Sequence, residues 1–121
     1  MPRRRPGEPG EGTACGRPCA AYRLGLKDRI GAVHPLRFDA RCRCTIFSGH
    51  VQSAIDLLPD RRQAGLRYFR VELLDETSEQ VRAILDLYSR ALAGWLDGAD
   101  AAAQLAELTA GGVRRGSWDF D

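Results

Sequence analysis

Four cysteines are the residues of this sequence whose type and spacing most clearly suggest chemistry. Cys15 and Cys19 enclose the tripeptide GRP, and a second pair, Cys42 and Cys44, is separated by one arginine. Cysteine thiolates bind zinc and iron–sulfur clusters, so both pairs are candidate metal ligands. The spacing leaves the metal open, because structural zinc sites usually show paired C-x₂-C knuckles whereas the spacings in iron–sulfur proteins vary.

The surroundings of the two pairs differ. Cys15 and Cys19 lie in a segment rich in glycine and proline with few apolar neighbours, which favours a ligand role over packing. Cys42 and Cys44 continue the apolar alternation that includes Phe38, so spacing alone favours burial on one face of a strand. Two such side chains would lie about 6.5–7 Å apart, which also suits two ligands of one cluster.

The composition is that of a globular chain. The chain has 121 residues, is 44% hydrophobic and carries a formal net charge of +2, which is too small to indicate nucleic-acid binding by itself. No apolar run approaches the ~20 residues that span a membrane, and no apolar signal-peptide region follows the N-terminal arginines. We therefore expect a cytoplasmic protein, whose reduced cysteines indicate a metal centre, redox chemistry or burial rather than disulfides.

The elements that would position the cysteines begin after a Pro-, Gly- and Arg-rich segment, residues 1–14, which is expected to be disordered. Two extended segments broken by a turn at 28–31 are expected next. The second should continue as one strand, straight or bent, over 36–46, because apolar and polar residues alternate throughout that range.

Further along, helical and strand-like patterns alternate. The expected elements are a helix within 51–65 interrupted near Pro59, a strand over 66–74, a helix opened by a capping box of Thr77 and Gln80, a helix over roughly 100–110, and a flexible tail over 111–121. This alternation predicts an α/β fold with a parallel sheet. The strands are too few for a sheet without exposed edges, so the chain is expected to be part of a larger fold.

Three segments, EGTACGRPC, LKDRIGAVHPLRFDARCRCTIFSG and GLRYFRVELLDET, resemble the C-terminal part of the collagenase-like peptidase family, whose catalytic type is unknown. Its members show a CGRPC segment, an L-x-D-R-x-G-x-x-x-P-L-x-x-D-x-x-C-R-N-T-x-F-N motif and an R-x-E-L-L-D-E strand end. The resemblance runs from about Glu11 to about Trp95. The chain departs from it at Cys44 and Ser48, where the motif has asparagines, and the family's upstream cysteine-rich segment is missing.

The resemblance implies a fold and a cofactor. Residues 15–110 would form an incomplete collagenase-like peptidase domain, consisting of the C-terminal βα units of a (β/α)₈ (TIM-type) barrel. Full-length relatives bind a 4Fe-4S iron–sulfur cluster, and Cys15, Cys19 and Cys42 match family cysteines. Cys44 is an additional candidate ligand, since a cubane takes four. With part of the ligand set missing, we do not expect this chain to hold a cluster firmly.

The resemblance also implies an activity, either as a peptidase (a hydrolase) or as a hydroxylation factor for RNA or for ubiquinone synthesis. A non-catalytic interaction fragment is the further alternative, and the chain alone is expected to be inactive. Expected partners are a peptide or RNA substrate and another chain that completes the barrel, with no membrane.

The sequence shows no recognisable pair of nucleophile and base, so the catalytic residues stay unassigned. Arg70 and Glu72 are the candidates, because they alternate with the apolar face of the expected strand and could point into a barrel lumen. A structural ion pair between them is an equal alternative. Neither His34 nor His50 has a recognisable partner.

Overall fold

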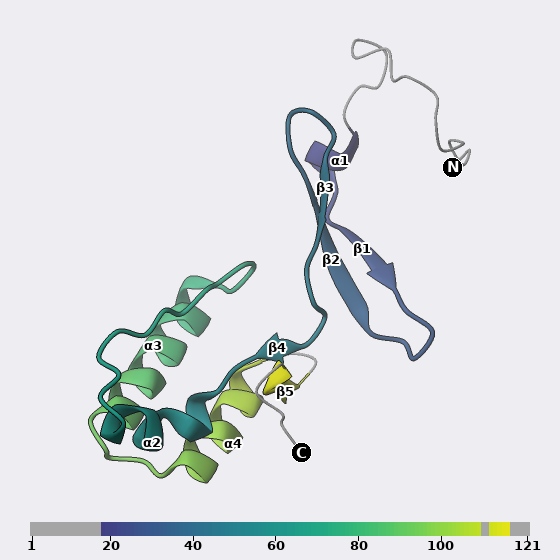
Figure 1. Ribbon diagram of the computed structural model, residues 1–121. Helices are drawn as coiled ribbons and strands as arrows, with labels where there is room; N and C mark the ends of the chain where they lie inside the picture. Colours follow the sequence, from purple (N-terminus) through teal and green to yellow (C-terminus); the bar gives the residue numbers. More distant parts are fainter. Residues whose placement is uncertain (1–17, 110–111, 117–121) are drawn as a thin grey trace. The chain divides into compact units, whose positions relative to one another are not determined.

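The computed structural model describes residues 18–109 and 112–116 (Figure 1). The chain divides into two compact units, Met1–Ser48 and Gly49–Asp121. Unit 1 carries a small antiparallel sheet, and unit 2 carries helices and a short parallel strand pair. The expected mixed α/β class is confirmed, but the parallel sheet is wrong for the three strands of unit 1, because two tight turns reverse the chain between consecutive strands. The expectations for residues 1–14 and for the end of the tail, 117–121, lie outside the described residues.

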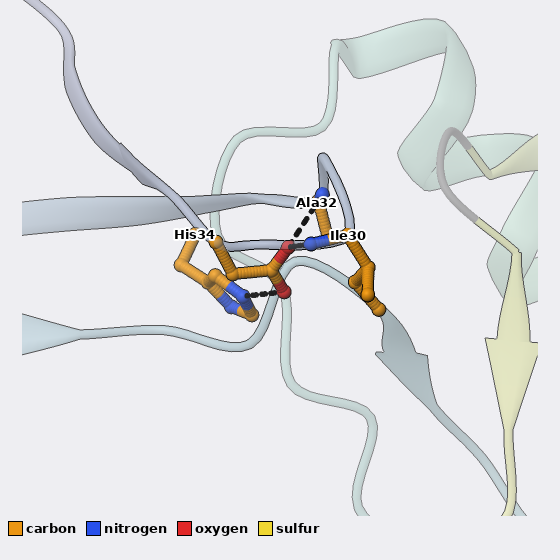
Figure 2. Close-up of polar contacts among 4 residues, drawn as sticks. Ile30, Ala32 and His34 are labelled. Carbon is orange, nitrogen blue, oxygen red and sulfur yellow. Dashed lines mark hydrogen bonds and ion pairs between the residues drawn. The ribbon is translucent and has the colours of Figure 1, made fainter.

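Unit 1 contains a short helix followed by a three-stranded antiparallel sheet in the order β1-β2-β3. Its elements are α1 (Pro18–Ala21), β1 (Leu24–Lys27), β2 (Val33–Phe38) and β3 (Cys44–Ile46). The turn predicted at 28–31 is confirmed: Asp28 accepts hydrogen bonds from the backbone N–H groups of Ile30 and Ala32, both at 2.9 Å (Figure 2). Such Asx turns favour chain reversal, and Gly31 supplies the positive φ of 92° that the turn requires.

The single strand predicted over 36–46 is wrong. The chain reverses after Phe38, and β2 pairs with β3 in the register Leu36↔Ile46 and Phe38↔Cys44. The physical reason is the side chain of Asp39, whose Oδ1 accepts hydrogen bonds from the backbone N–H groups of Arg41 at 2.8 Å and Arg43 at 3.0 Å. These bonds stabilise a tight loop at the expense of an extended ladder.

Unit 2 is mainly helical. Its elements are β4 (Val51–Gln52), the 3₁₀ helix η1 (Ile55–Leu57), α2 (Leu58–Gln63), α3 (Ser78–Leu92), α4 (Gly98–Leu108) and β5 (Val113–Arg114), which pairs in parallel with β4. Pro59 sits in the first turn of α2, where a proline ring is tolerated, so the predicted helix starts later than its apolar spacing indicated. Part of the predicted tail forms β5.

The start of α3 confirms the predicted capping box. The Thr77 hydroxyl accepts a hydrogen bond from the backbone N–H of Gln80 at 3.2 Å, and the Gln80 side chain accepts one from the Thr77 N–H at 2.9 Å. Both bonds satisfy N–H groups that the first turn of a helix leaves without intrahelical partners. The start of this helix is therefore encoded locally.

The core of unit 2 lies between its helices. Its buried members all carry apolar side chains: Ile55, Leu58, Ile84, Leu87, Ala91, Ala101 and Leu105. They come from η1, α2, α3 and α4, so these elements bury one another's apolar faces. In unit 1, by contrast, none of the described residues is buried.

The strand predicted over 66–74 is wrong, because this part of the chain forms no strand in the structure. The alternation of the segment nevertheless has a structural correlate. Phe69 and Val71 are half-buried against the helical core, whereas Tyr68, which directly precedes Phe69 in the sequence, is 95% exposed. The apolar residues thus cover helices, and none of the strands that the structure describes pairs with the segment.

Candidate functional site

The candidate metal ligands fall in unit 1. Cys15 lies outside the described residues. Cys19, in α1, is partly exposed, whereas Cys42, in the β2–β3 loop, and Cys44, the first residue of β3, are exposed. The burial that spacing favoured for Cys42 and Cys44 is therefore wrong, and so is their shared strand face, because the chain has reversed before it reaches Cys42.

Cys42 has the more unusual backbone of the two. Its φ of 60° lies in the left-handed region, which residues with a Cβ rarely adopt. The loop around it is tied together by backbone hydrogen bonds, from the Cys42 N–H to the Asp39 carbonyl at 3.1 Å and from the Asp39 N–H to the Arg43 carbonyl at 3.0 Å. The Arg43 guanidinium also donates to the Asp39 carboxylate. Asp39 thus fixes the backbone from which the Cys42 thiol is exposed.

The three described thiols belong to one small unit, but they do not form a ready metal site. The helix that carries Cys19 contacts β2, and Figure 1 shows α1 near the end of unit 1 at which the β2–β3 loop lies. Cysteine thiolates are the usual ligands of iron–sulfur clusters. Within residues 18–109 and 112–116, however, no three His, Cys, Asp or Glu residues come close enough together to hold a metal ion. A cluster would therefore need ligands beyond these three thiols, such as Cys15, which lies outside the described residues.

The two catalytic candidates lie in unit 2 and contact each other. A guanidinium nitrogen of Arg70 is 2.8 Å from a carboxylate oxygen of Glu72, and the side chains are 84% and 75% exposed. This arrangement is the ion pair that the sequence offered as the alternative. Exposed pairs of this kind contribute little to stability, because water screens both charges.

His34 has a partner that the sequence did not reveal. Its Nε2 lies 3.0 Å from Oδ2 of Asp28, across the first hairpin (Figure 2). Together with the two turn amides, this contact lowers the pKa of the Asp28 carboxyl below its usual value, with the His34 hydrogen bond as the largest cause. The contact organises the turn that precedes β2. A recognisable signal was the Asp residue at the start of the DRIG turn.

Unit 2 also contains a cavity of about 290 Å³. Of the residues that line it, only Arg70 is a candidate site residue in the sequence analysis. In its wall the hydroxyls of Ser53 and Tyr88 lie 2.6 Å apart. Burial raises the pKa of the Tyr88 phenol, and the hydrogen bond with Ser53 opposes that change. No local pattern could reveal this pair, because its members come from distant parts of the sequence.

Comparison with known proteins adds no relative: no family model, curated protein or solved structure matches the chain. None of the helices that the structure describes has the length and apolar character needed to cross a membrane. The comparisons therefore leave the resemblance described from the sequence motifs as an expectation.

Proposed function

We propose that the chain is the C-terminal part of a cytoplasmic protein of the collagenase-like peptidase family, and that it carries cysteine ligands of an iron–sulfur site. The observation that supports this most is the β2–β3 loop, which exposes the Cys42 thiol from a left-handed backbone. A cysteine in such a position has no packing role, and strained backbone of this kind clusters at functional sites.

The motif residues support the same proposal because several of them have definable structural roles. In the segment that resembles L-x-D-R-x-G, Asp28 and Gly31 build the β1–β2 turn. In the segment that resembles D-x-x-C-R, Asp39 builds the loop that presents Cys42. Both motif aspartates therefore stabilise the small sheet that holds the thiol.

In this proposal the ligands are Cys15, Cys19 and Cys42, with Cys44 as a further thiol. A bound cluster would supply electron transfer. Residues 15–110 would contribute the last βα units of an incomplete (β/α)₈ barrel. Another chain would complete the barrel.

A hydroxylation factor for RNA or for ubiquinone synthesis is the second candidate, ahead of proteolysis by this chain alone. The Arg70–Glu72 pair argues only against proteolysis by these two residues, because an exposed ion pair is not prepared for acid–base catalysis of peptide hydrolysis. The substrate would then be RNA or a quinone precursor instead of a peptide.

Anaerobic reconstitution with ferrous iron and sulfide tests the cysteine assignment. We expect the full chain to develop a brown absorbance that fades quickly in air, and we expect Cys42→Ser and Cys19→Ser to lose most of it. Thr45→Ala, which alters an exposed side chain of β3, is the matched control and should leave the yield unchanged. A normal yield in Cys42→Ser would remove this residue from the ligand set.

A further inference from the structure

The cavity of unit 2 combines an apolar lining with hydrogen-bond donors, which is the usual composition of a small-molecule site. Ile55 and Leu58 are buried members of the core, and Phe69 and Val71 pack against that core from the segment after α2. All four line the cavity. Its volume of about 290 Å³ lies at the lower end of the range for ligand pockets, so it suits a small molecule or one amino-acid side chain.

The Ser53–Tyr88 pair can donate one hydrogen bond to a ligand. The Ser53 hydroxyl already accepts a hydrogen bond from the Ile55 N–H at 3.1 Å. The two hydroxyls carry two protons, of which one is used in the bond between them, so the other is available to a ligand. Because burial raises the pKa of Tyr88, the phenol stays protonated at neutral pH. The pair therefore favours a ligand that accepts hydrogen bonds.

Two guanidinium groups add hydrogen-bond donors to the lining. Arg115 is anchored by Asp56, whose Oδ2 accepts hydrogen bonds from two of its nitrogens, and Arg70 pairs with Glu72. A guanidinium has five N–H donors, so each arginine keeps donors beyond those used in its ion pair. Among the described residues that line the cavity there is no Asp or Glu, because the carboxylates of Asp56 and Glu72 that pair with the two arginines lie outside the lining. The charged groups of the lining are therefore guanidinium donors.

We propose that this cavity binds a small carboxylate with an apolar substituent. The carboxylate accepts hydrogen bonds from Arg70, Arg115 and the Ser53–Tyr88 pair, and the substituent contacts Ile55, Leu58, Phe69 and Val71. Such a group is found in a free aliphatic acid and at the C-terminus of a peptide that ends in an apolar residue. The site lies in unit 2 and uses none of the cysteines, so it is independent of the proposed cluster.

Calorimetric titration of the full chain with hexanoate, hexanamide and acetate tests both halves of the proposal. We expect hexanoate to bind at least about tenfold more tightly than either of the others, because hexanamide lacks the charge and acetate lacks the chain. A short peptide ending in leucine and its C-terminal amide distinguish the two sources of the carboxylate. Equal binding of hexanoate and hexanamide, or no binding of any carboxylate, overturns the proposal.

Substitutions assign the binding to this cavity. Arg70→Gln should weaken hexanoate binding at least about fivefold, and Tyr88→Phe should weaken it while preserving the aromatic ring. Arg67→Gln removes an exposed arginine of the same segment that does not line the cavity, and it should have no effect. Because Arg70 is largely exposed, its substitution should leave the circular dichroism spectrum unchanged. Unaltered affinity in both Arg70→Gln and Tyr88→Phe would place the binding elsewhere and refute the site.

Discussion

One carboxylate, that of Asp28, links the first turn of unit 1 to strand β2 through His34, whose Nε2 lies 3.0 Å from it (Figure 2). The same carboxylate accepts hydrogen bonds from two amides of the turn. These contacts favour the ionised form, which is why the pKa of Asp28 is lowered. A single acidic side chain therefore connects the β1–β2 turn to β2, in addition to the backbone pairing of the two strands.

This relationship predicts how the hairpin responds to acid. A carboxyl whose pKa is lower in the folded than in the unfolded state stabilises the fold above the unfolded value, 3.8, and loses that contribution as pH falls through the folded pKa. An NMR titration should therefore give Asp28 a midpoint below 3.8, with the Ile30 and Ala32 amides shifting in parallel. Asp28→Asn should abolish these shifts. A midpoint at or above 3.8 would mean that the contacts do not persist in solution.

The capping box predicts a local contribution to the stability of α3. Thr77→Ala removes the hydroxyl that accepts the Gln80 N–H, so the free energy of unfolding should fall by about 1 kcal/mol. Ser78→Ala, one residue into the helix, is the matched control and should change stability by only a few tenths of that amount. Urea denaturation followed by circular dichroism measures both. Equal effects of the two substitutions would argue against the cap.

Core packing predicts a larger difference within the same helix. Leu87 is fully buried, whereas Leu85 is 46% exposed. Leu87→Ala should lower the free energy of unfolding by about 2–5 kcal/mol, because it removes apolar contacts and leaves a cavity. Leu85→Ala should cost much less, since its environment already includes water. If thermal melts rank the two variants in the opposite order, α3 packs through a different face.

Interactions between neighbours in sequence were predictable, and those between distant residues were not. Thr77 and Gln80 lie within one helical turn, and the turn at Asp28 spans a few residues, so the sequence predicts both the capping box and the turn. The alternation over 36–46 predicts one strand, but Asp39 stabilises a loop there without interrupting the alternation of apolar and polar residues. Strand propensity over 66–74 likewise indicates a strand only when a partner strand is present.

The candidate sites follow the same division. The residue type of the cysteines indicated metal chemistry, but their exposure depended on the loop that Asp39 forms. The ion pair of Arg70 and Glu72 was among the alternatives because the two residues are two apart. The cavity was not foreseen, since Ser53, Tyr88 and Arg115 are brought together only by the packing of unit 2.

The uneven burial of the two units predicts uneven protection from hydrogen exchange. Backbone amides of α3 and α4 lie over a buried apolar core, whereas the sheet of unit 1 has no buried residue among those described. Amides with little buried apolar surface around them open at low free-energy cost. In the isolated chain, the β2 amides should therefore exchange at least about a hundredfold faster than those around Leu87 in the middle of α3.

Comparable protection of the two sets of amides would show that a surface not provided by the described residues covers the sheet, such as a second chain. Repeating the exchange over a dilution series would then identify self-association, because protection by a second copy falls with concentration whereas protection within one chain does not.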